Sequence, residues 1–574
     1  MFDTLPAPLS SLTPELSYQL KNDLNHLLLR IIKNNAGTQF ARTSGTLAGF
    51  REAFKEATSD DDLLQAFRTC VQFSVYDAYL PYFSRFFQQP KEAAVKDLFA
   101  PGIPEFLTAS SGTSGGKPKF FARYSPAAMA GGRIHVPVDT SISSFMWYMG
   151  YRSIDINAED GHSVAKIKIC SGTAASMRSY LGFGEEDPCM SERLPGHAAP
   201  LAVAFIGHYR TFVLMHALFA MARRDLEAMS MGFLNTFADM IHYIEDEYTV
   251  LVDAIEKGAI PNFEGMDHVR CHLESTLNRD PERAAELRAI GLPSTSLGWA
   301  GRVWPAFTKL CTIASGPAAS LIPQAKWWLG PTCHIISRAF AAGECFVATP
   351  YDPMNLNQYK LTRDDIVEFL DVSKDESIKN LYAAWEVQPG KRYEVIVTTH
   401  NGLWRYRLDD IVEITGFSPL DGSPILNYIE RRSAGIHLWF VWTPESVIRE
   451  AIGAAQDALG KILEFTATTE ETVSPARFDY FVEVAGDSEP NLQAASEQVF
   501  DTLCATNNAY QRALDTGKFQ KPKIHVVKQG TFQEFRRWKA EQGSGISVGQ
   551  IKVPVVFSDE TTRKWVHERV IQEL

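Results

Sequence analysis

The sequence lacks the marks of several protein classes. None of its eight cysteines forms a C-x-x-C pair, and no histidine pair has the spacing of a zinc site, so free thiols in a reducing compartment are expected. Acidic residues outnumber basic ones, and the formal net charge of -12 disfavours nucleic acid or an anionic membrane as a partner. Internal repeats and low-complexity tracts are also missing, which excludes a solenoid and a largely disordered chain.

Hydrophobic runs long enough to cross a membrane are missing as well. The most apolar stretch, residues 200–222, contains His208, Tyr209, Arg210 and His216, whereas a spanning helix needs about 20 predominantly apolar residues. We interpret it as a buried helix. The first ten residues have neither the basic nor the apolar region of a signal peptide, and the last four match no retention signal. A cytoplasmic globular protein is expected, with the oligomeric state open and a monomer as one expectation.

Length and composition allow about two to four domains with sizeable cores, because 45% of the 574 residues are hydrophobic. Apolar residues recur at helical spacing in three N-terminal segments, residues 14–34, 47–73 and 207–257. From about residue 310 onward, short β-rich runs bounded by Gly, Pro and Asn appear. This mixture predicts an α/β protein.

A compact pattern begins near residue 442. Its predicted elements are helix 444–459, strand 463–468, strand 477–484, helix 491–515, strand 522–527 and helix 531–541. Such a pattern predicts a small α+β unit. We therefore divide the chain into a large N-terminal domain, residues 1–434, and a small C-terminal domain, residues 435–574, with a hinge near residues 432–442.

A loop rich in Ser, Thr and Gly covers residues 110–119, with the sequence S-S-G-T-S-G-G-K-P-K. Glycines such as Gly112 permit positive φ angles, so backbone N–H groups can converge on an anion. The loop also offers four hydroxyls and two ammonium groups to phosphate oxygens, from Ser110, Ser111, Thr113, Ser114, Lys117 and Lys119. This composition favours a phosphate-binding loop.

Three interpretations of the loop stay open. A P-loop requires a glycine where Ser111 stands and a Ser or Thr where Pro118 follows Lys117, so that motif fails at two positions. A flexible surface loop has a similar composition. The third interpretation is the phosphate loop of acyl-adenylating enzymes, which is rich in Ser, Thr and Gly and ends in Lys.

The loop belongs to an ordered series of segments. They are S-V-Y-D-A-Y-L-P-Y-F at 74–83, the loop at 110–119, an apolar helix at 208–225, D-P-E-R-A-A-E-L through R-V-W-P at 280–305, and G-Q-I-K-V-P at 549–554. In this order they resemble the auxin-responsive Gretchen-Hagen acyl-acid amido synthetases, a family of the adenylate-forming superfamily. The resemblance covers most of the chain and both predicted domains.

The resemblance implies a fold and a reaction. The fold is α/β, with a large adenylate-forming N-terminal domain of mixed β-sheets or a barrel with packed helices, and a small mobile C-terminal domain. The reaction uses ATP and Mg²⁺ to activate a small carboxylic acid as acyl-AMP, releases pyrophosphate, and transfers the acyl group to an amine, in this family an amino acid. A ligase with coenzyme A or a hydroxyl as acceptor, and a catalytically silent nucleotide- or acid-binding protein, are the alternatives. The sequence names neither the acid nor the acceptor.

Residues 340–344, F-A-A-G-E, resemble the family motif Y-x-S-S-E. The resemblance implies that Phe340 lies near the adenine, and that Glu344 lies beside the ATP phosphates and holds Mg²⁺, a cation that prefers oxygen ligands. Ala342 and Gly343 stand where the family has two serines, so the polar contacts of those hydroxyls are lost. An exposed carboxylate is the alternative interpretation of Glu344.

Residues 401–411, N-G-L-W-R-Y-R-L-D-D-I, resemble the family motif G-L-Y-R-Y-R-x-G-D-V. The resemblance implies that Asp410 binds both ribose hydroxyls as an acceptor, with an acidic turn as the alternative. Asp409 stands where the family has Gly, and we expect it to perturb the turn. Tyr428 and Arg431 lie in Y-I-E-R-R, which resembles F-I-x-R-R, so Tyr428 is expected on the adenosine and Arg431 at ribose or phosphate.

Residues 545–554, G-I-S-V-G-Q-I-K-V-P, resemble the family motif G-A-S-x-N-Q-Y-K-V-P. The resemblance brings Lys552 to the α-phosphate of ATP, where an ammonium stabilises the charge of the transition state. A solvated lysine on an edge strand is the alternative. Ser315 and Gly316 resemble a turn that lines the substrate cavity of the family. Tyr209 is a further candidate for the acyl pocket, with a place in the core as its alternative.

Overall fold

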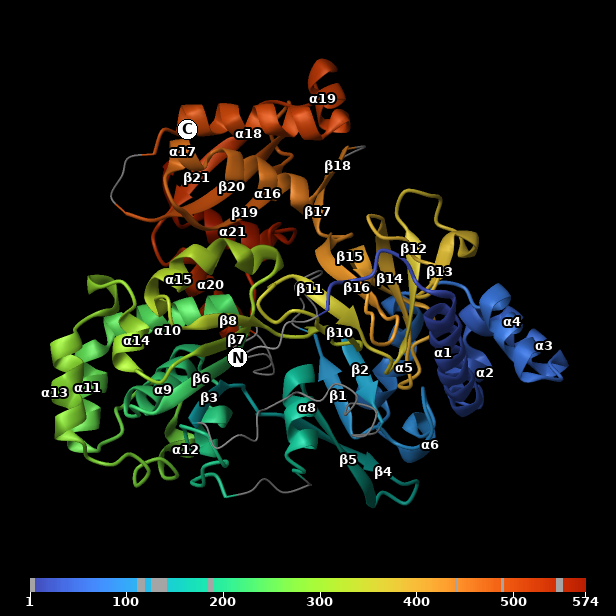
Figure 1. Ribbon diagram of the computed structural model, residues 1–574, viewed down its shortest axis with the longest axis horizontal. Coiled ribbons are helices and arrows are strands. Elements are labelled where there is room, and N and C mark those ends of the chain that lie inside the picture. Colours follow the sequence, from blue (N-terminus) through green and yellow to red (C-terminus); the bar gives the residue numbers. More distant parts are fainter. Residues whose placement is uncertain are drawn as a thin grey trace.

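The computed structural model describes residues 6–110, 119–124, 142–183, 189–438, 441–486, 490–542 and 551–573 (Figure 1). In this part of the chain, helices pack against one eight-stranded sheet, three four-stranded sheets and one two-stranded sheet. The predicted α/β class is therefore confirmed. Most elements after residue 444, among them α16 (Glu445–Ala454), α18 (Leu492–Thr506) and α19 (Asn508–Asp515), lie together at the top of Figure 1, and α20 (Thr531–Gln542) lies below them among the green helices.

The predicted phosphate loop connects two strands of one four-stranded sheet. β1 (Phe106–Ala109) pairs antiparallel with β2 (Phe120–Arg123) and parallel with β5 (Ser163–Ser171). At the base of the loop, the backbone N–H of Ser110 donates to the carbonyl of Lys119 at 2.8 Å. The N–H of Lys119 donates in return to Oγ of Ser110 at 3.0 Å. The hairpin thus fixes both ends of the loop side by side.

A second sheet has four parallel strands in the order β3-β6-β7-β8. The strands are β3 (Ile142–Met146), β6 (Leu226–Phe233), β7 (Lys309–Ile313) and β8 (His334–Ser337). The carboxyl ends of parallel strands meet at one edge, where open α/β sheets bind their ligands. This edge faces the eight-stranded sheet across the candidate site.

The segment 207–257 is not the run of helices that its periodicity predicts. α9 (Tyr209–Met221) is followed by β6, and only then by α10 (Leu234–Asp246) and α11 (Tyr248–Lys257). The prediction missed β6 because a largely buried parallel strand is an apolar run that resembles part of a buried helix. In α9 all side chains except that of Arg210 are buried, which confirms the predicted buried helix. Among the described helices, none has the length and apolar character needed to cross a membrane.

The eight-stranded sheet carries the segments that are predicted to contact ATP. Its strand order is β13-β12-β14-β15-β16-β11-β10-β9. β15 (Tyr406–Phe417) pairs antiparallel with β16 (Pro424–Arg431), and their register places Asp410 opposite Arg431. β9 (Phe340–Ala341) forms one edge of this sheet. The sheet therefore presents three predicted motifs to the same region.

The C-terminal elements follow the predicted order closely. β20 (Arg477–Val484) has the predicted bounds. Three further elements differ from prediction by one or two residues at their ends, β19 (Ile462–Glu470), β21 (Lys523–Val527) and α20 (Thr531–Gln542). Two predicted helices are each divided, into α16 (Glu445–Ala454) and α17 (Gln456–Leu459) and into α18 (Leu492–Thr506) and α19 (Asn508–Asp515). Asn507 starts α19 because its side chain accepts two backbone N–H groups of that helix.

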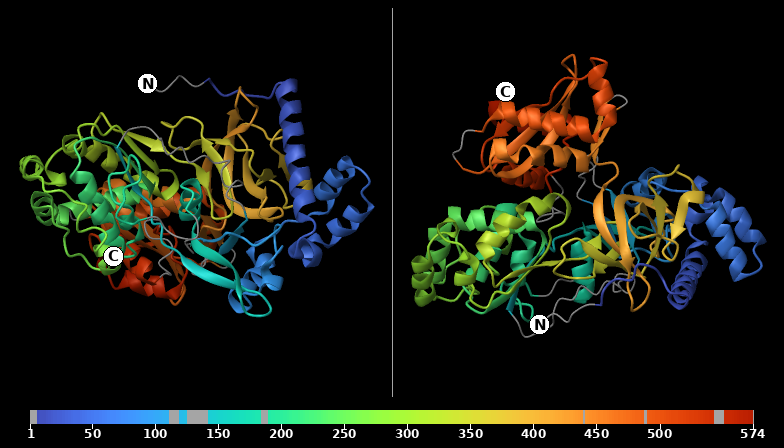
Figure 2. Two further views of the ribbon diagram at one scale, coloured as in Figure 1. Left: turned by 90° about the horizontal axis from the view of Figure 1, so that it is seen from below. Right: turned by 45° about the horizontal axis from the view of Figure 1, so that its top comes forward.

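The C-terminal elements pack on the N-terminal part of the chain through α20. Figure 2 shows the red elements against the green ones in its right-hand view. Ala540 of α20 belongs to the same hydrophobic core as most of α9 and α10, and Ile551 packs against that core. The contact is thus partly apolar. The domain boundary between residues 434 and 435 stays a prediction.

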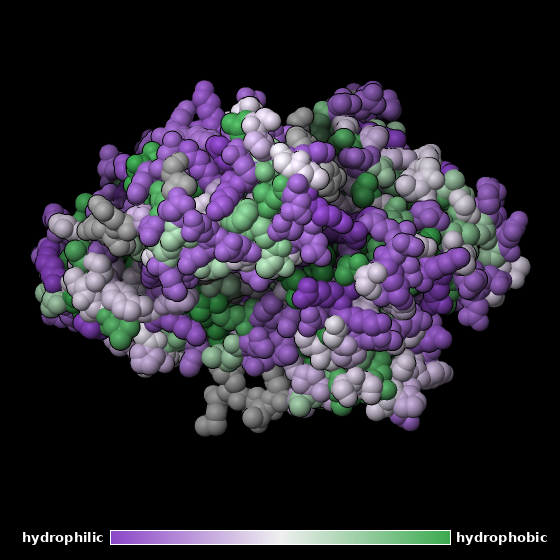
Figure 3. Space-filling model, turned by 90° about the horizontal axis from the view of Figure 1, so that it is seen from above, coloured by the Kyte–Doolittle hydropathy of each residue, from purple (hydrophilic) through white to green (hydrophobic). Residues whose placement is uncertain are grey.

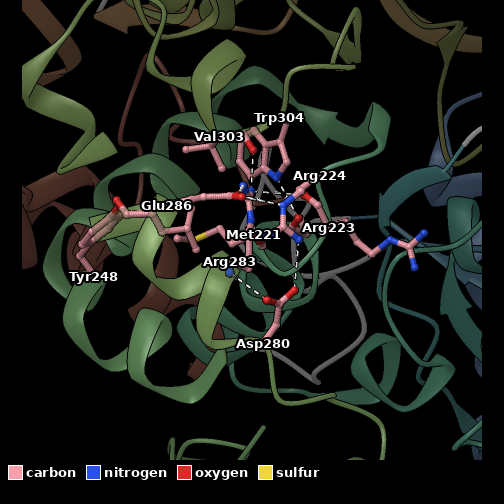
Figure 4. A network of polar contacts seen from close by, with 11 residues as sticks. Met221, Arg223, Arg224, Tyr248, Asp280, Arg283, Glu286, Val303 and Trp304 are labelled. Carbon is pink, nitrogen blue, oxygen red and sulfur yellow. Dashed lines mark hydrogen bonds and ion pairs between the residues drawn. The ribbon is translucent and has the colours of Figure 1, made fainter. Parts of the chain in front are cut away.

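The stretch D-P-E-R through R-V-W-P has a structural role (Figure 4). Arg283 lies on α13 (Pro281–Ile290), and its buried guanidinium donates to the carbonyls of Met221 at 2.8 Å and Val303 at 2.5 Å. The carboxylate of Asp280 caps α13 by accepting the N–H of Arg283 at 2.8 Å. Arg283 therefore ties α13 to the end of α9 and to the segment before β7, away from the cleft described below.

Candidate active site

A cleft of about 1890 Å³ opens where the β1–β2 hairpin, the β3-β6-β7-β8 sheet, the eight-stranded sheet and residues 552–558 meet. Its lining includes predicted site residues from well-separated parts of the chain, namely Ser110, Lys119, Ser315, Gly316, Phe340, Glu344, Asp410, Tyr428, Arg431 and Lys552. The predicted residues Ser111, Gly112, Thr113 and Ser114 lie outside the described residues. Seen from above, in Figure 3, most of the surface is hydrophilic, with hydrophobic side chains gathered near its middle.

Asp410 and Arg431 form an ion pair in this cleft. Nε of Arg431 lies 3.1 Å from Oδ1 of Asp410, in agreement with their opposite places on β15 and β16. Asp410 is 3% exposed, and its charge raises the pKa of Arg431 further above its usual range. In the described structure Oδ2 of Asp410 accepts no hydrogen bond, so this oxygen is available to a ligand hydroxyl. The pair holds the carboxylate in a fixed direction.

The backbone at Asp409 suits the glycine that stands at this position in the resembled motif. Its φ angle is +69°, in the left-handed region that favours glycine. The side chain compensates, because Oδ2 of Asp409 accepts the N–H of Ser433 at 3.1 Å. Its carbonyl accepts the N–H of Arg432 at 2.6 Å. The turn is therefore retained despite the departure from the family pattern.

Glu344 is half-buried in the cleft and not a surface carboxylate. Loss of water raises the pKa of Glu344, and the charge of Arg431 opposes this rise. The preceding carbonyl, that of Gly343, accepts Nη2 of Arg123 at 2.5 Å and Oγ1 of Thr108 at 3.2 Å. Among the described residues, no cation lies within ion-pair distance of Glu344. A half-buried carboxylate that forms no ion pair with the described residues fits a hard cation such as Mg²⁺.

Three aromatic rings form one wall of the cleft. The ring centroid of Phe340 lies 5.7 Å from that of Tyr428 and 6.0 Å from that of Tyr359. Gly316 has φ of +60°, and a Cβ built there lies 3.5 Å from the Tyr428 ring. Oγ of Ser315 lies 3.3 Å from the Tyr359 hydroxyl. Ser315 and Gly316 therefore adjoin this aromatic wall, which has the character of a surface for a flat base.

Lys552 reaches the cleft from the C-terminal part of the chain. Its ammonium lies 4.1 Å from the centroid of the Phe233 ring, at the carboxyl end of β6. The side chain keeps contact with solvent, yet the walls of the cleft replace much of the surrounding water and lower its pKa to about 8. Arg431 lowers this pKa further, and Asp410 opposes that effect. The structure thus brings Lys552 within the electrostatic reach of the predicted ribose ligand.

Three family descriptions match the chain in order. They are the GH3 family N-terminal domain over residues 19–333, the GH3 family central domain over residues 361–431, and the GH3 family C-terminal domain over residues 446–561. Together they cover well over half of the chain. The chain belongs to the GH3 family. This membership confirms the resemblance that was drawn from the sequence motifs.

Individual GH3 proteins align with the chain at low identity. Indole-3-acetic acid-amido synthetase GH3.17 of Arabidopsis thaliana is 24% identical over 596 residues, which cover 95% of this chain and 92% of that protein. The alignment with indole-3-acetic acid-amido synthetase GH3.4 of the same organism is also 24% identical and spans 61% of that protein. The solved structure of GH3.15 acyl acid amido synthetase has a TM-score of 0.79 at 21% identity, over 98% of this chain and 96% of that chain. This likeness confirms the predicted arrangement of a large N-terminal and a smaller C-terminal domain.

Tyr209 lies apart from the cleft of this GH3 chain and is not among its lining residues. Its hydroxyl donates to Oδ2 of Asp239 at 2.6 Å, and Asp239 pairs with Arg536 of α20. Tyr209 is therefore part of the contact between the C-terminal elements and the rest of the chain. The sequence did not orient Tyr209, because a helix that is apolar on all sides has no polar face to mark its direction.

Three residues of the GH3 cleft were missed by the sequence analysis. Arg123 holds the Gly343 carbonyl, and Tyr76 accepts the N–H of Phe120 at 2.9 Å while its ring lies 5.6 Å from the Lys119 ammonium. Arg338 also lines the cleft. Tyr76 lies in segment 74–83, which resembles the family, but no residue of that segment was predicted as a site residue. Arg123 lies shortly after the loop 110–119, and Arg338 lies shortly before the motif 340–344.

Proposed function

We propose that this GH3 protein is an ATP-dependent acyl-acid amido synthetase. It activates a carboxylic acid as acyl-AMP, releases pyrophosphate, and transfers the acyl group to the amine of an amino acid. The observation that carries the proposal is that Lys552 reaches the same cleft as Glu344 and the Asp410–Arg431 pair. Relatives that align along most of the chain are named amido synthetases, which favours an amine over coenzyme A or a hydroxyl as acceptor.

In the first half-reaction, a carboxylate oxygen of the acid attacks the α-phosphorus of ATP, and the bond to the pyrophosphate oxygen breaks. Asp410 accepts the ribose hydroxyls through its available oxygen, and the rings of Phe340 and Tyr428 pack against the adenine. Lys552 donates to the α-phosphate oxygens, where negative charge develops in the transition state. Lys119 adds positive charge at the end of the phosphate loop.

Glu344 would hold Mg²⁺ in this proposal. When bound there, the ion would neutralise phosphate charge and make the α-phosphorus more electrophilic. The hydrogen bonds of Arg123 and Thr108 to the Gly343 carbonyl fix the backbone from which the Glu344 side chain extends into the cleft. The carboxylate has to be ionised to bind the ion, and its raised pKa makes binding weaker in acid.

In the second half-reaction, the amine nitrogen attacks the acyl carbon, AMP leaves with the bonding electron pair, and the nitrogen loses its extra proton to solvent. The C-terminal domain turns about residues 432–442 between the two steps, so that Lys552 withdraws and the acceptor enters. One cleft then serves both half-reactions. Both substrates are small molecules, and a cytoplasmic location is consistent with eight free thiols.

The exchange of [³²P]pyrophosphate into ATP tests the first half-reaction. Wild-type protein with Mg²⁺ is incubated with phenylacetate, benzoate, indole-3-acetate or decanoate, and products with added amino acids are identified by mass spectrometry. Acid-dependent exchange together with an amide product supports the proposal. A thioester or an ester in place of the amide would assign a different acceptor, and ATP binding without exchange would favour a silent binding protein.

A further inference from the structure

Arg338 and Trp147 meet in the cleft although they come from opposite edges of the β3-β6-β7-β8 sheet. Trp147 follows the last residue of β3, and Arg338 follows the last residue of β8. Three strand spacings separate these edges, about 14 Å. The guanidinium carbon of Arg338 nevertheless lies 4.3 Å from the centroid of a Trp147 ring. The two side chains therefore extend toward each other across the ends of β6 and β7.

The guanidinium of Arg338 has no acceptor in the described part of the chain. Four other arginines line the cleft, and each donates to a protein oxygen, Arg123 to Gly343, Arg431 to Asp410, and both Arg407 and Arg432 to Glu394. For Arg338, by contrast, the interaction seen among the described residues is the aromatic face of Trp147. Its N–H donors are thus free to bind a ligand.

Desolvation of the Arg338 charge is energetically unfavourable for the protein unless an anionic ligand binds there. Its side chain is partly withdrawn from water, and this desolvation lowers the pKa of Arg338 to about 10. Arginine stays charged at neutral pH, so the protein holds a desolvated cation beside Cys311 without a counter-ion from the described residues. Stacking on Trp147 fixes the plane of the guanidinium. A planar fork of N–H donors fits a carboxylate with two parallel hydrogen bonds.

Arg338 and Lys552 lie over different aromatic rings of the cleft. Lys552 lies over Phe233 at the end of β6, and the Arg338 guanidinium lies over Trp147, which follows β3. Cys311 of β7, the strand between β6 and β8, also lines the cleft. Each cation can therefore meet its own anionic group, and we assign to Arg338 an anion other than the carboxylate that attacks the α-phosphorus at Lys552.

We propose that Arg338, oriented by Trp147, binds a second substrate carboxylate. This inference rests on the proposed amido synthetase function. Two substrates can supply this carboxylate. One is the amino-acid acceptor, whose α-carboxylate lies two bonds from the attacking nitrogen. The other is a dicarboxylic acyl substrate, whose remote carboxylate extends away from the acyl-AMP. In either case Arg338 determines specificity, and Trp147 is a positioning residue.

The two half-reactions distinguish these sources, because pyrophosphate exchange requires the acid alone and amide formation requires both substrates. Arg338→Gln removes the charge and the fork, while Arg338→Lys retains the charge only. Arg392→Gln, at an exposed position on β14 (Arg392–Thr398), is the matched control. Circular dichroism and melting curves show whether each variant is folded. Exchange is measured with phenylacetate, indole-3-acetate and adipate, and amide formation with glycine, alanine and glutamate against glycinamide and alaninamide.

If the acceptor supplies the carboxylate, Arg338→Gln raises KM for the amino acids about 10- to 100-fold, leaves KM for the acid in exchange unchanged, and abolishes the preference of wild type for amino acids over their amides. Arg338→Lys retains part of this preference. If the acyl substrate supplies the carboxylate, Arg338→Gln raises KM for adipate in the pyrophosphate exchange assay and leaves KM for phenylacetate unchanged.

A folded Arg338→Gln that exchanges normally and keeps wild-type KM values and amide discrimination would overturn the inference. Absence of exchange in the wild type would contradict the proposed function itself. In that event thermal-shift titration with glutamate and adipate tests Arg338 without turnover. If glutamate or adipate raises the melting temperature of wild type and of Arg392→Gln but not of Arg338→Gln, the inference is supported. Equal shifts in all three proteins refute it.

Discussion

Arg536 of α20 forms a buried double ion pair with Asp239 of α10. Nη2 of Arg536 lies 2.5 Å from Oδ1 of Asp239, and Nε lies 2.7 Å from Oδ2. Nη1 of Arg536 also donates to Glu464 of β19 at 2.6 Å. Arg536 and Asp239 are 3% and 1% exposed. Because the charges are desolvated, the cluster is favourable only while all of its members stay together, and it holds the C-terminal elements where Lys552 reaches the cleft.

Replacement of Arg536 by Met leaves the buried Asp239 and the half-buried Glu464 without their cation. Breaking a buried ion pair in this way costs about 3–5 kcal/mol, so we expect a lower melting temperature and weaker pyrophosphate exchange. Thermal unfolding followed by circular dichroism and the exchange assay measure both effects. Lys564→Met, at an exposed position on α21 (Glu560–His567), is the control. An Arg536→Met variant with the stability and exchange rate of the control would contradict this role.

The pH dependence of adenylation follows from Lys552. Its ammonium is needed in the charged form, and its pKa is lowered to about 8, so the charge is present below this pH and lost above it. We therefore expect kcat/KM for ATP in the exchange reaction to fall as the pH rises through about 8. Lys552→Arg keeps its charge throughout this range and is expected to abolish the alkaline fall. A wild-type profile that stays flat up to pH 10 would count against the assignment.

The left-handed turn at Asp409 gives a prediction on stability. Asp409→Gly relieves a backbone cost of about 1–2 kcal/mol but loses the hydrogen bond from the Ser433 N–H, so its net effect is expected to be small. Asp409→Ala keeps the strain and loses the hydrogen bond, so it is expected to destabilise by about 1 kcal/mol. Urea unfolding of the two variants and wild type checks the order. Equal stabilities of the Ala and Gly variants would refute the strain argument.

Asp410 is expected to determine the affinity for ATP. Asp410→Ala removes the proposed ribose acceptor and leaves Arg431 without its ion pair. Loss of charge-assisted hydrogen bonds worth about 1.5–3 kcal/mol raises the dissociation constant for ATP about 10- to 100-fold. Isothermal titration calorimetry measures this constant, with Glu413→Gln of the same strand as the control. Unchanged ATP binding in Asp410→Ala would remove Asp410 from the site.

Periodicity predicted most of the C-terminal elements, because apolar residues recur in them at strand or helix spacing between clear turn residues. The bounds of β20 were predicted to the residue, and those of α20 to within one residue. Periodicity failed at β6, where a buried parallel strand has no alternation to separate it from the neighbouring helices. β20 was found because polar and apolar residues alternate in much of its sequence, although most of its side chains are buried, whereas the sequence of β6 has no such alternation.

The site residues could be predicted only from motifs, because they are far apart in the sequence. The motifs placed Glu344, Asp410 and Lys552 in one prediction, and these side chains line one cleft in the structure. Their catalytic roles stay predictions. Arg338 was not found because its significance lies in what surrounds it, an aromatic ring from another strand and no acceptor among the described residues. Such a relationship exists only after folding.

The most direct test of the account is acid-dependent pyrophosphate exchange in wild type, Lys552→Ala and the control Lys528→Ala, an exposed lysine of the same domain. Removal of a group that stabilises charge in a transition state costs about 10²- to 10³-fold in rate. We predict a loss of this size in Lys552→Ala, with ATP binding largely retained and Lys528→Ala unaffected. Exchange at the wild-type rate in Lys552→Ala would contradict the account, because it would show that adenylation does not need the residue that brings the two domains to one cleft.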